Sequence, residues 1–148
     1  MSSASPATLG RSPPITGRTV VAAAFLALAV GFLAYASLLA PQDYGRAAPI
    51  WVANALTVVF VLRSAPGRWP VWVTAGFLGN FAADIAIGNT VITSAALAGA
   101  NVVEVLICGL GLRRMAPEGF DPGRMRHLLL GAGFALLGGF VSAVLASA

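Results

Sequence analysis

Five blocks of apolar residues, separated by short polar or turn-forming segments, organise the chain. They cover residues 19–39, 47–62, 69–88, 91–112 and 127–147. A helix of about 20 residues crosses the roughly 30 Å hydrocarbon core of a bilayer, and most of the blocks approach that length. Because backbone groups inside hydrocarbon must be hydrogen-bonded within their own segment, each block is expected to be helical. The pattern predicts an all-α, polytopic transmembrane helix bundle with five spans.

The first block has a second interpretation, as a secretory signal peptide. Arg18 gives it a positive flank, and the Ala-Tyr-Ala triplet at 34–36 resembles a cleavage site. The uncharged run at 19–39 is longer than the roughly 7 to 15 apolar residues of a signal peptide, which favours an uncleaved span. Residues 1–18 are rich in Ser, Pro and Gly and carry too little apolar surface to offset the entropy of ordering, which predicts a flexible tail.

The composition excludes an ordinary soluble domain. Of the 148 residues, 58% are hydrophobic and 9% are charged, whereas a typical soluble domain has roughly 25% charged residues. The single cysteine, Cys108, lies in an apolar block, so an internal disulfide bond and a cysteine-built metal cluster are both excluded. Because the chain is so rich in apolar residues and so poor in charged ones, the lipid bilayer is the first partner that the composition predicts.

All nine basic residues other than the histidine are arginines, and their distribution predicts how the chain crosses the membrane. Eight lie in the N-terminal tail and in the segments after the second and fourth blocks, and only Arg46 lies in an alternate segment. Since short segments rich in arginine stay in the cytoplasm, the N-terminus is expected there and the chain emerges outside after the fifth span. The arginines sit singly or in pairs between apolar runs, which argues against nucleic-acid binding.

This orientation also bears on domain organisation. We expect residues 19–148 to form an integral-membrane domain of the bacterial inner membrane, preceded by a cytoplasmic tail at 1–18. A protein that signals into the cytoplasm needs at least one further crossing after an odd number of spans. The domain is therefore expected to be incomplete at its C-terminus.

Asparagine and acidic residues occur inside these apolar blocks. Asn54, Asn80 and Asn101 lie near the middle of the second, third and fourth blocks, so three carboxamides at similar depth can form one interhelical belt. Asp84 follows Asn80 by four residues and Glu104 follows Asn101 by three, which places each pair on one helix face. The predicted orientation puts Asp84 toward the outer surface and Glu104 in the inner half.

Two interpretations of these five residues stay open. The structural one is hydrogen bonding between helices, which contributes about 0.6 to 2 kcal/mol per bond. The functional one is contact with a small ligand or ion, or a change of protonation, because hydrocarbon does not solvate an ionised carboxylate such as that of Glu104. Asp84 is shallow enough to reach interfacial water, which favours the structural interpretation for that residue.

Small residues predict where helices pack closely. In the fifth block they recur every four positions and form a stripe: Gly131, Ala135, Gly139 and Ala143. A shorter stripe in the first block consists of Ala23, Ala27 and Gly31, and Gly76 lies one turn before Asn80. Small residues let two backbones approach, and the neighbouring helix can belong to the same chain or to a second copy in a homodimer.

The sequence contains no recognisable catalytic constellation, so the chain by itself is not expected to be an enzyme. It lacks a nucleophile elbow, an HExxH motif and a glycine loop that would cradle phosphate. His127 has no second His, Cys or carboxylate at ligand spacing, so we expect it to be structural and propose no metal site. No motif identifies a cofactor.

Three segments together resemble the first type of bacterial membrane-associated sensor domain (MASE type 1). Their sequences are APIWVANALTVVFVL, RWPVWVTAGFLGNFAADIAIG and AALAGANVVEVLICGLGLRRM. The resemblance covers residues 49–115 and extends weakly through the fifth block. It rests on the order and spacing of Trp51 with Asn54, Trp69-Pro70, Gly76 with Gly79-Asn80, Asn101 with Glu104, and Arg113-Arg114. The chain departs from the family at Val52 and Ala53, where prolines are frequent, and at Ala55, where glycine is frequent.

This resemblance implies a sensory function. Domains of that family have more spans than this chain and lie at the N-termini of sensor histidine kinases, diguanylate cyclases and phosphodiesterases. It implies a signal-input domain that regulates such a cytoplasmic output in the complete protein, but it names no stimulus because the family's ligands are mostly undefined. The residues alone also allow a small solute-binding or transport subunit with a midplane pathway, or purely structural polar residues.

Overall fold

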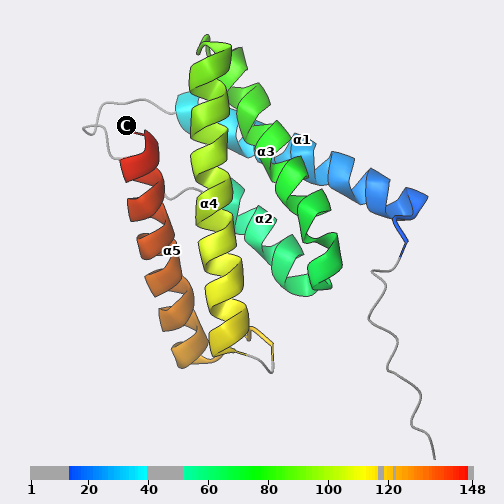
Figure 1. The fold of residues 1–148 in the computed structure, drawn as a ribbon, viewed down its shortest axis with the longest axis vertical. Coiled ribbons are helices and arrows are strands. Elements are labelled where there is room, and N and C mark those ends of the chain that lie inside the picture. Colours follow the sequence, from blue (N-terminus) through cyan, green and yellow to red (C-terminus); the bar gives the residue numbers. More distant parts are fainter. Residues whose placement is uncertain (1–13, 40–51, 117–118, 122, 147–148) are drawn as a thin grey trace, which may run out of the picture.

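The computed structural model describes residues 14–39, 52–116, 119–121 and 123–146, and these residues form an all-helical structure (Figure 1). This confirms the predicted all-α fold. The elements within these residues are α1 (Gly17–Leu39), α2 (Val52–Arg63), the short 3-10 helix η2 (Pro66–Arg68), α3 (Trp69–Ala86), α4 (Val91–Met115) and α5 (Met125–Ala146).

Three of these helices are long and apolar enough to cross a membrane: α1, α4 and α5. Helix α2 has 12 residues, which span about 18 Å and fall short of the hydrocarbon thickness. The first part of the second predicted block, residues 47–51, lies outside the described residues. Helix α3 has 18 residues and includes two strongly polar side chains, Asn80 and Asp84. By length and composition, therefore, the described residues contain three candidate spans and a shorter apolar helix, where five spans were expected.

Two helix boundaries differ from the predicted blocks, for local reasons. Helix α3 ends at Ala86, two residues early, because Gly88 adopts a φ of +96° that interrupts the helix before Asn89. Helix α4 continues to Met115, three residues past the predicted end. Arginines fit there because the last turn of a helix favours positive charge.

Helices α1 and α3 pack backbone against backbone (Figure 1). A Cβ atom on Gly79 would lie 2.5 Å from the Ala27 carbonyl oxygen and 2.9 Å from the Gly31 nitrogen, so only glycine fits there. This contact confirms the tight packing predicted from the small residues of the first block. Leu26, Val30 and Ala34 of α1 are buried on either side of it.

Helices α2, α3 and α4 pack against one another and are tied together at one end. The rings of Phe60 and Trp72 lie 5.1 Å apart in a tilted arrangement. Arg113 Nη1 donates a hydrogen bond of 3.2 Å to the Ser64 carbonyl oxygen, and its guanidinium lies 5.4 Å from the centre of the Trp69 ring. The end of α4 is thereby fixed to the turn between α2 and α3.

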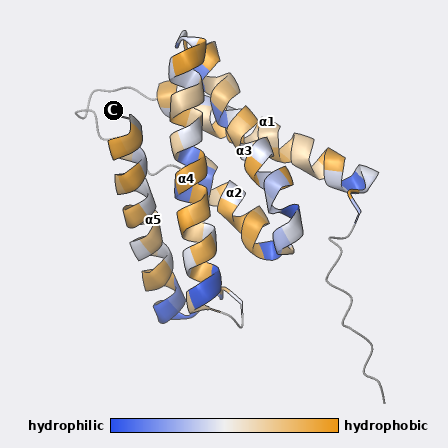
Figure 2. Ribbon diagram, in the orientation of Figure 1, coloured by the Kyte–Doolittle hydropathy of each residue, from blue (hydrophilic) through white to orange (hydrophobic). Residues whose placement is uncertain are grey.

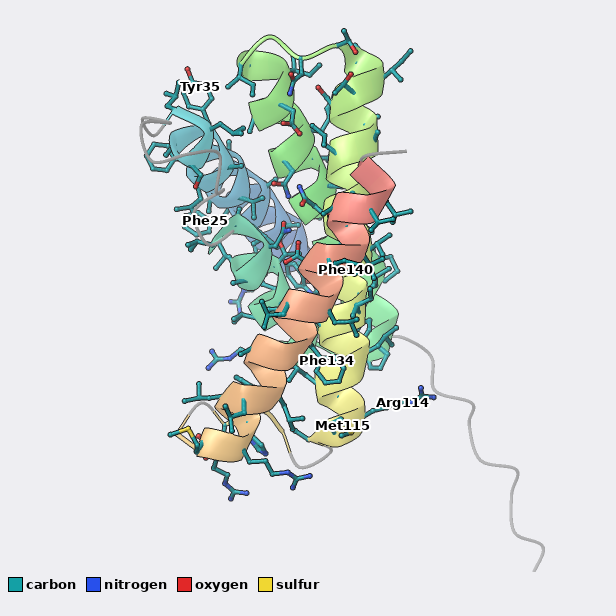
Figure 3. All side chains as sticks on the ribbon, turned by 90° about the vertical axis from the view of Figure 1, so that its left-hand side faces the viewer. Phe25, Tyr35, Arg114, Met115, Phe134 and Phe140 are labelled. Atoms are coloured by element: carbon teal, nitrogen blue, oxygen red, sulfur yellow. The ribbon has the colours of Figure 1, made fainter. Side chains whose placement is uncertain are left out.

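Helix α5 packs mainly on α4. The ring of Phe134, which is labelled in Figure 3, lies against Gly111. Gly138 lies against Glu104. Beyond the hydrophilic first turn, the rest of the surface of α5 is largely apolar (Figure 2) and exposes large side chains such as Leu136 and Phe140. In a bilayer such a surface contacts lipid chains or another apolar helix.

Three residues of the predicted small-residue stripe of α5 take little part in this contact: Gly131, Ala135 and Gly139. Ala135 is exposed, and a Cβ on Gly139 would meet no atom within 4 Å. A Cβ on Gly131 would touch only the Phe120 ring, at 3.5 Å. Gly138, which the four-residue repeat omits, makes the close approach to α4 instead. Packing of the stripe against another helix stays a prediction.

His127 fixes the loop that precedes α5. The Asp121 backbone nitrogen donates a 2.9 Å hydrogen bond to His127 Nδ1, and the imidazole stacks on the Phe120 ring at 5.9 Å. The side chain is buried. The structure therefore gives this histidine a structural role, as expected.

A candidate polar site between α2, α3 and α4

The structure brings four of the five polar residues singled out in the sequence into one cluster. Asn54 comes from α2, Asn80 from α3, and Asn101 and Glu104 from α4. The first two are almost fully enclosed, at 2% and 3% exposure. Asn101 and Glu104 are half-buried. We call these four residues the polar cluster.

A continuous chain of hydrogen bonds links the polar cluster. Asn80 Nδ2 donates to the Gly76 carbonyl oxygen at 3.1 Å and to Asn54 Oδ1 at 3.2 Å. Asn54 Nδ2 donates to Asn101 Oδ1 at 3.0 Å and to Glu104 Oε2 at 2.8 Å. The three helices are thus joined by side-chain amides at one level.

The direction of this chain follows from its first acceptor. A backbone carbonyl can only accept, so the NH2 group of Asn80 must face Gly76. Asn54 then receives the second Asn80 proton on its oxygen, which turns its own NH2 group toward α4. Both amide protons of Asn80 and both amide protons of Asn54 are used, and the last of them goes to Glu104 Oε2.

A small cavity adjoins the polar cluster. Its volume is about 10 Å³, which holds about one water molecule. Asn54, Thr57, Asn80 and Asn101 form its polar walls, and Val73, Gly76, Phe77, Val102 and Val105 complete the lining.

Two buried oxygen atoms at this cavity have no hydrogen-bond partner among the described residues. They are Thr57 Oγ1 and Asn80 Oδ1. Gly76 lies directly against the threonine, since a Cβ at that glycine would be 2.7 Å from Thr57 Oγ1. Sequence reasoning missed Thr57. Its spacing of three residues from Asn54, on the same helix face, is the signal that could have found it.

Glu104 occupies a position between the polar cluster and α5. A Cβ on Gly138 of α5 would lie 2.9 Å from Glu104 Cγ and 3.2 Å from its carbonyl oxygen. Among the described residues, no arginine or histidine forms an ion pair with this carboxylate. The only side-chain donor to it there is Asn54.

Asp84, the fifth residue, lies apart from the polar cluster. Its carboxylate accepts a long 3.4 Å hydrogen bond from Asn89 Nδ2 in the turn after α3. The Asn89 backbone nitrogen also donates to the Asp84 carbonyl oxygen at 3.1 Å. These contacts place Asp84 with the turn that ends α3.

The described part of the chain contains no group of three His, Cys, Asp or Glu side chains that could hold a metal ion.

The MASE1 family model matches residues 18–148. The chain belongs to the MASE1 family. MASE1 is a family of membrane-associated sensor domains that are not catalytic by themselves, so the chain is an integral-membrane sensory protein. No curated protein and no solved structure matches it.

Family membership confirms the resemblance drawn from the sequence and extends it. The match includes α1 and α5, whereas the resemblance was strong only over residues 49–115. In this MASE1 domain, motif residues that lie far apart in the sequence meet in one place, because Asn54, Asn80, Asn101 and Glu104 form the polar cluster. The paired motif Arg113-Arg114 contributes to the anchor at the end of α4 through Arg113.

Proposed function

We propose that the polar cluster is the input site of a membrane sensor and that Glu104 passes its state to α5. The observation that carries this proposal is the double contact of Glu104. Its carboxylate receives the last hydrogen bond of the chain, from Asn54, and its backbone and Cγ lie against Gly138. A ligand or proton that changes this hydrogen bond therefore acts on the α4–α5 contact.

Such a change has to favour one of two helix arrangements by its own free energy, since otherwise nothing is transmitted. The hydrogen bonds of the polar cluster fit that requirement because they join three helices that could be held together in more than one pattern of donors and acceptors. The small cavity beside them supports sensing rather than a solute pathway, because a space of about 10 Å³ admits little more than one water.

The proposal includes five spans and a cytoplasmic N-terminus in a bacterial inner membrane. The arginine distribution supports this orientation, and Arg63, Arg68 and Arg113 lie at one end of α2, α3 and α4. A reporter fused after Ala148 that is active only outside the cytoplasm tests it. Activity of a cytoplasmic reporter at the same position would break the assignment of five spans.

In the complete gene product, we propose that this domain regulates a histidine kinase, a diguanylate cyclase or a phosphodiesterase. The test compares two neighbouring substitutions in that product, Gly138→Ala and Gly139→Ala. The first places a methyl group against Glu104, and the second places it in open space. Both variants change the same residue type on the same helix.

We expect Gly138→Ala to shift the basal kinase or cyclic-dinucleotide output, and Gly139→Ala to leave it at the wild-type level. Membrane levels of both proteins are measured so that a loss of folding is recognised. Equal outputs from two equally abundant variants would contradict the proposed route through Glu104.

A further inference from the structure

An open groove lies between the start of α1 and the end of α2, and we call it the α1–α2 groove. Its volume is about 600 Å³, within the range of roughly 300 to 1,000 Å³ that is usual for ligand sites. It shares no residue with the polar cluster or with the small cavity beside that cluster. The groove is lined by Gly17, Arg18, Val21, Ala22 and Phe25 of α1 and by Phe60 of α2.

The walls of the α1–α2 groove are apolar over most of their length. Val21 and Phe25 are 70% and 68% exposed, so the described residues cover little of their surface. Phe60 forms the opposite wall, and the ring of Trp72, which lies 5.1 Å away, holds it in place. Such walls suit a hydrocarbon chain, because a polar guest would lose its hydrogen bonds to water there and gain none in return.

One end of the groove carries positive charge. Arg18 lines the groove and precedes Val21 by three residues, so the two share a face of α1. Arg63 follows Phe60 by three residues and lies on the same face of α2. Both arginines are exposed, at the end of the structure where α1 begins and α2 ends.

No acid among the described residues neutralises this charge. The side chains of Arg18 and Arg63 form no ion pair and no hydrogen bond within that part of the chain. The three acids found there bond to other partners: Asp84 to Asn89, Glu104 to Asn54, and Asp121 to Arg124. A guest with negative charge at this end would therefore be stabilised, since guanidinium groups bind phosphate through strong, charge-assisted hydrogen bonds.

We propose that the α1–α2 groove binds an anionic phospholipid. One acyl chain lies along Val21, Phe25 and Phe60, and Arg18 and Arg63 hold the headgroup phosphate. An anionic lipid uses both features of the groove, as basic sites between membrane helices do. A free phosphate would leave the apolar walls unused, and a zwitterionic lipid would bring no net negative charge to the two arginines. The bound lipid would join the start of α1 to the end of α2, and this inference does not depend on the proposed sensory function.

The test is thermal unfolding of the purified chain in micelles of a nonionic detergent, at high ionic strength so that diffuse attraction between exposed charges is screened. Phosphatidylglycerol is added in increasing mole fraction, and phosphatidylcholine with the same acyl chains is the matched control. We expect the Tm to rise by on the order of a few °C per tenfold increase of phosphatidylglycerol beyond half-saturation. The rise with phosphatidylcholine should be clearly smaller, and inorganic phosphate without lipid should give none.

The headgroup contact is tested with three arginine variants. Arg18→Gln and Arg63→Gln should each raise the mole fraction of phosphatidylglycerol at half of the Tm rise by about tenfold, the effect of losing one hydrogen bond to a charged group. Arg114→Gln makes the same change of charge at an exposed position outside the groove and should behave as the wild type. Arg63→Gln keeps the test decisive if Arg18→Gln does not fold.

The acyl-chain contact is tested with two neighbouring valines of α1. Val21→Trp places a large side chain in the groove and should weaken binding of phosphatidylglycerol about tenfold or more. Val20→Trp makes the same change at a position that is exposed but does not line the groove, and it should bind as the wild type does. The Tm of each variant in detergent alone shows whether it folds.

Equal Tm rises with the two lipids would overturn the proposal. A comparable rise with inorganic phosphate alone would also overturn it, by assigning the arginines to a free anion. Equal losses in Arg18→Gln and Arg114→Gln would mean a general attraction to positive charge in place of a site, and undiminished binding in Val21→Trp would mean that no acyl chain occupies the groove.

Discussion

Two neighbouring residues of α3, Gly79 and Asn80, make two different kinds of contact with other helices. Gly79 meets the backbone atoms of Ala27 and Gly31 in α1, beside the Cβ of Val30. Asn80 meets α2 through a hydrogen bond to Asn54. The first contact depends on close packing alone, and the second depends on which groups donate and accept.

This difference matters in a membrane because lipid chains are as apolar as the side chains they replace. Helices there associate through close packing and hydrogen bonds rather than through burial of apolar surface. The contact at Gly79 depends only on the close approach of two helices, and it contains no side-chain group that could bind a proton or a ligand. The amide contact has such groups, so α1–α3 is suited to be the fixed frame and α2–α3–α4 the adjustable part.

We expect the largest loss of stability from Gly79→Leu, which disrupts the contact between α1 and α3. The new side chain would collide with the backbone of α1, which cannot move aside as a flexible side chain can. We expect a loss of about 3 kcal/mol or more in the free energy of unfolding, at the upper end for overpacked sites. Unfolding of the purified chain in mixed micelles measures it.

Gly99→Leu is the matched control for this variant. It makes the same change in α4, where a Cβ would meet no atom within 4 Å. Its stability should stay close to that of the wild type. A similar loss in both variants would mean that leucine is unfavourable in these helices for reasons other than the contact with α1.

We expect a smaller loss of stability from Asn54→Leu, which removes the hydrogen bonds that join α2 to α3 and α4. The substitution leaves Asn80, Asn101 and Glu104 without their shared partner. We expect a loss of about 2 kcal/mol, since a hydrogen bond between membrane helices contributes about 0.6 to 2 kcal/mol and such contributions are not fully additive. The same unfolding assay measures it. Full stability with an altered basal output would show that the bonds serve signalling and contribute no net stability.

The sequence predicts the contact of α3 with α1 and its contacts with α2 and α4 to different degrees. The helices themselves and the tight packing of Ala27 and Gly31 follow from hydropathy and the spacing of small residues, which are local properties. That three asparagines at mid-block lie near one another also follows, because depth in a bilayer is fixed by position along a span.

Other features depend on how the helices are rotated, which no single segment specifies. The place of Gly138 against Glu104 is one example, since the regular four-residue stripe of α5 pointed to Gly139 instead. The unpartnered Thr57 oxygen is another, because a threonine in a helix usually bonds its own backbone and attracts no notice.

We expect the smallest loss of stability from Asp84→Asn, which tests a second polar residue on the same face of α3 as Asn80. Asp84 lies one turn beyond Asn80, but its partner is the turn residue Asn89, at a long 3.4 Å. Asp84 is buried, but asparagine keeps its shape and can accept the same hydrogen bond, so we expect a change of about 0.6 kcal/mol or less, the average contribution of one hydrogen bond between membrane helices. Unfolding in the same micelles measures it beside Asn54→Leu. A loss as large as that of Asn54→Leu would show that the carboxylate of Asp84 belongs energetically to the polar cluster, and the division of α3 into a signalling level and a terminal turn would then have to be redrawn.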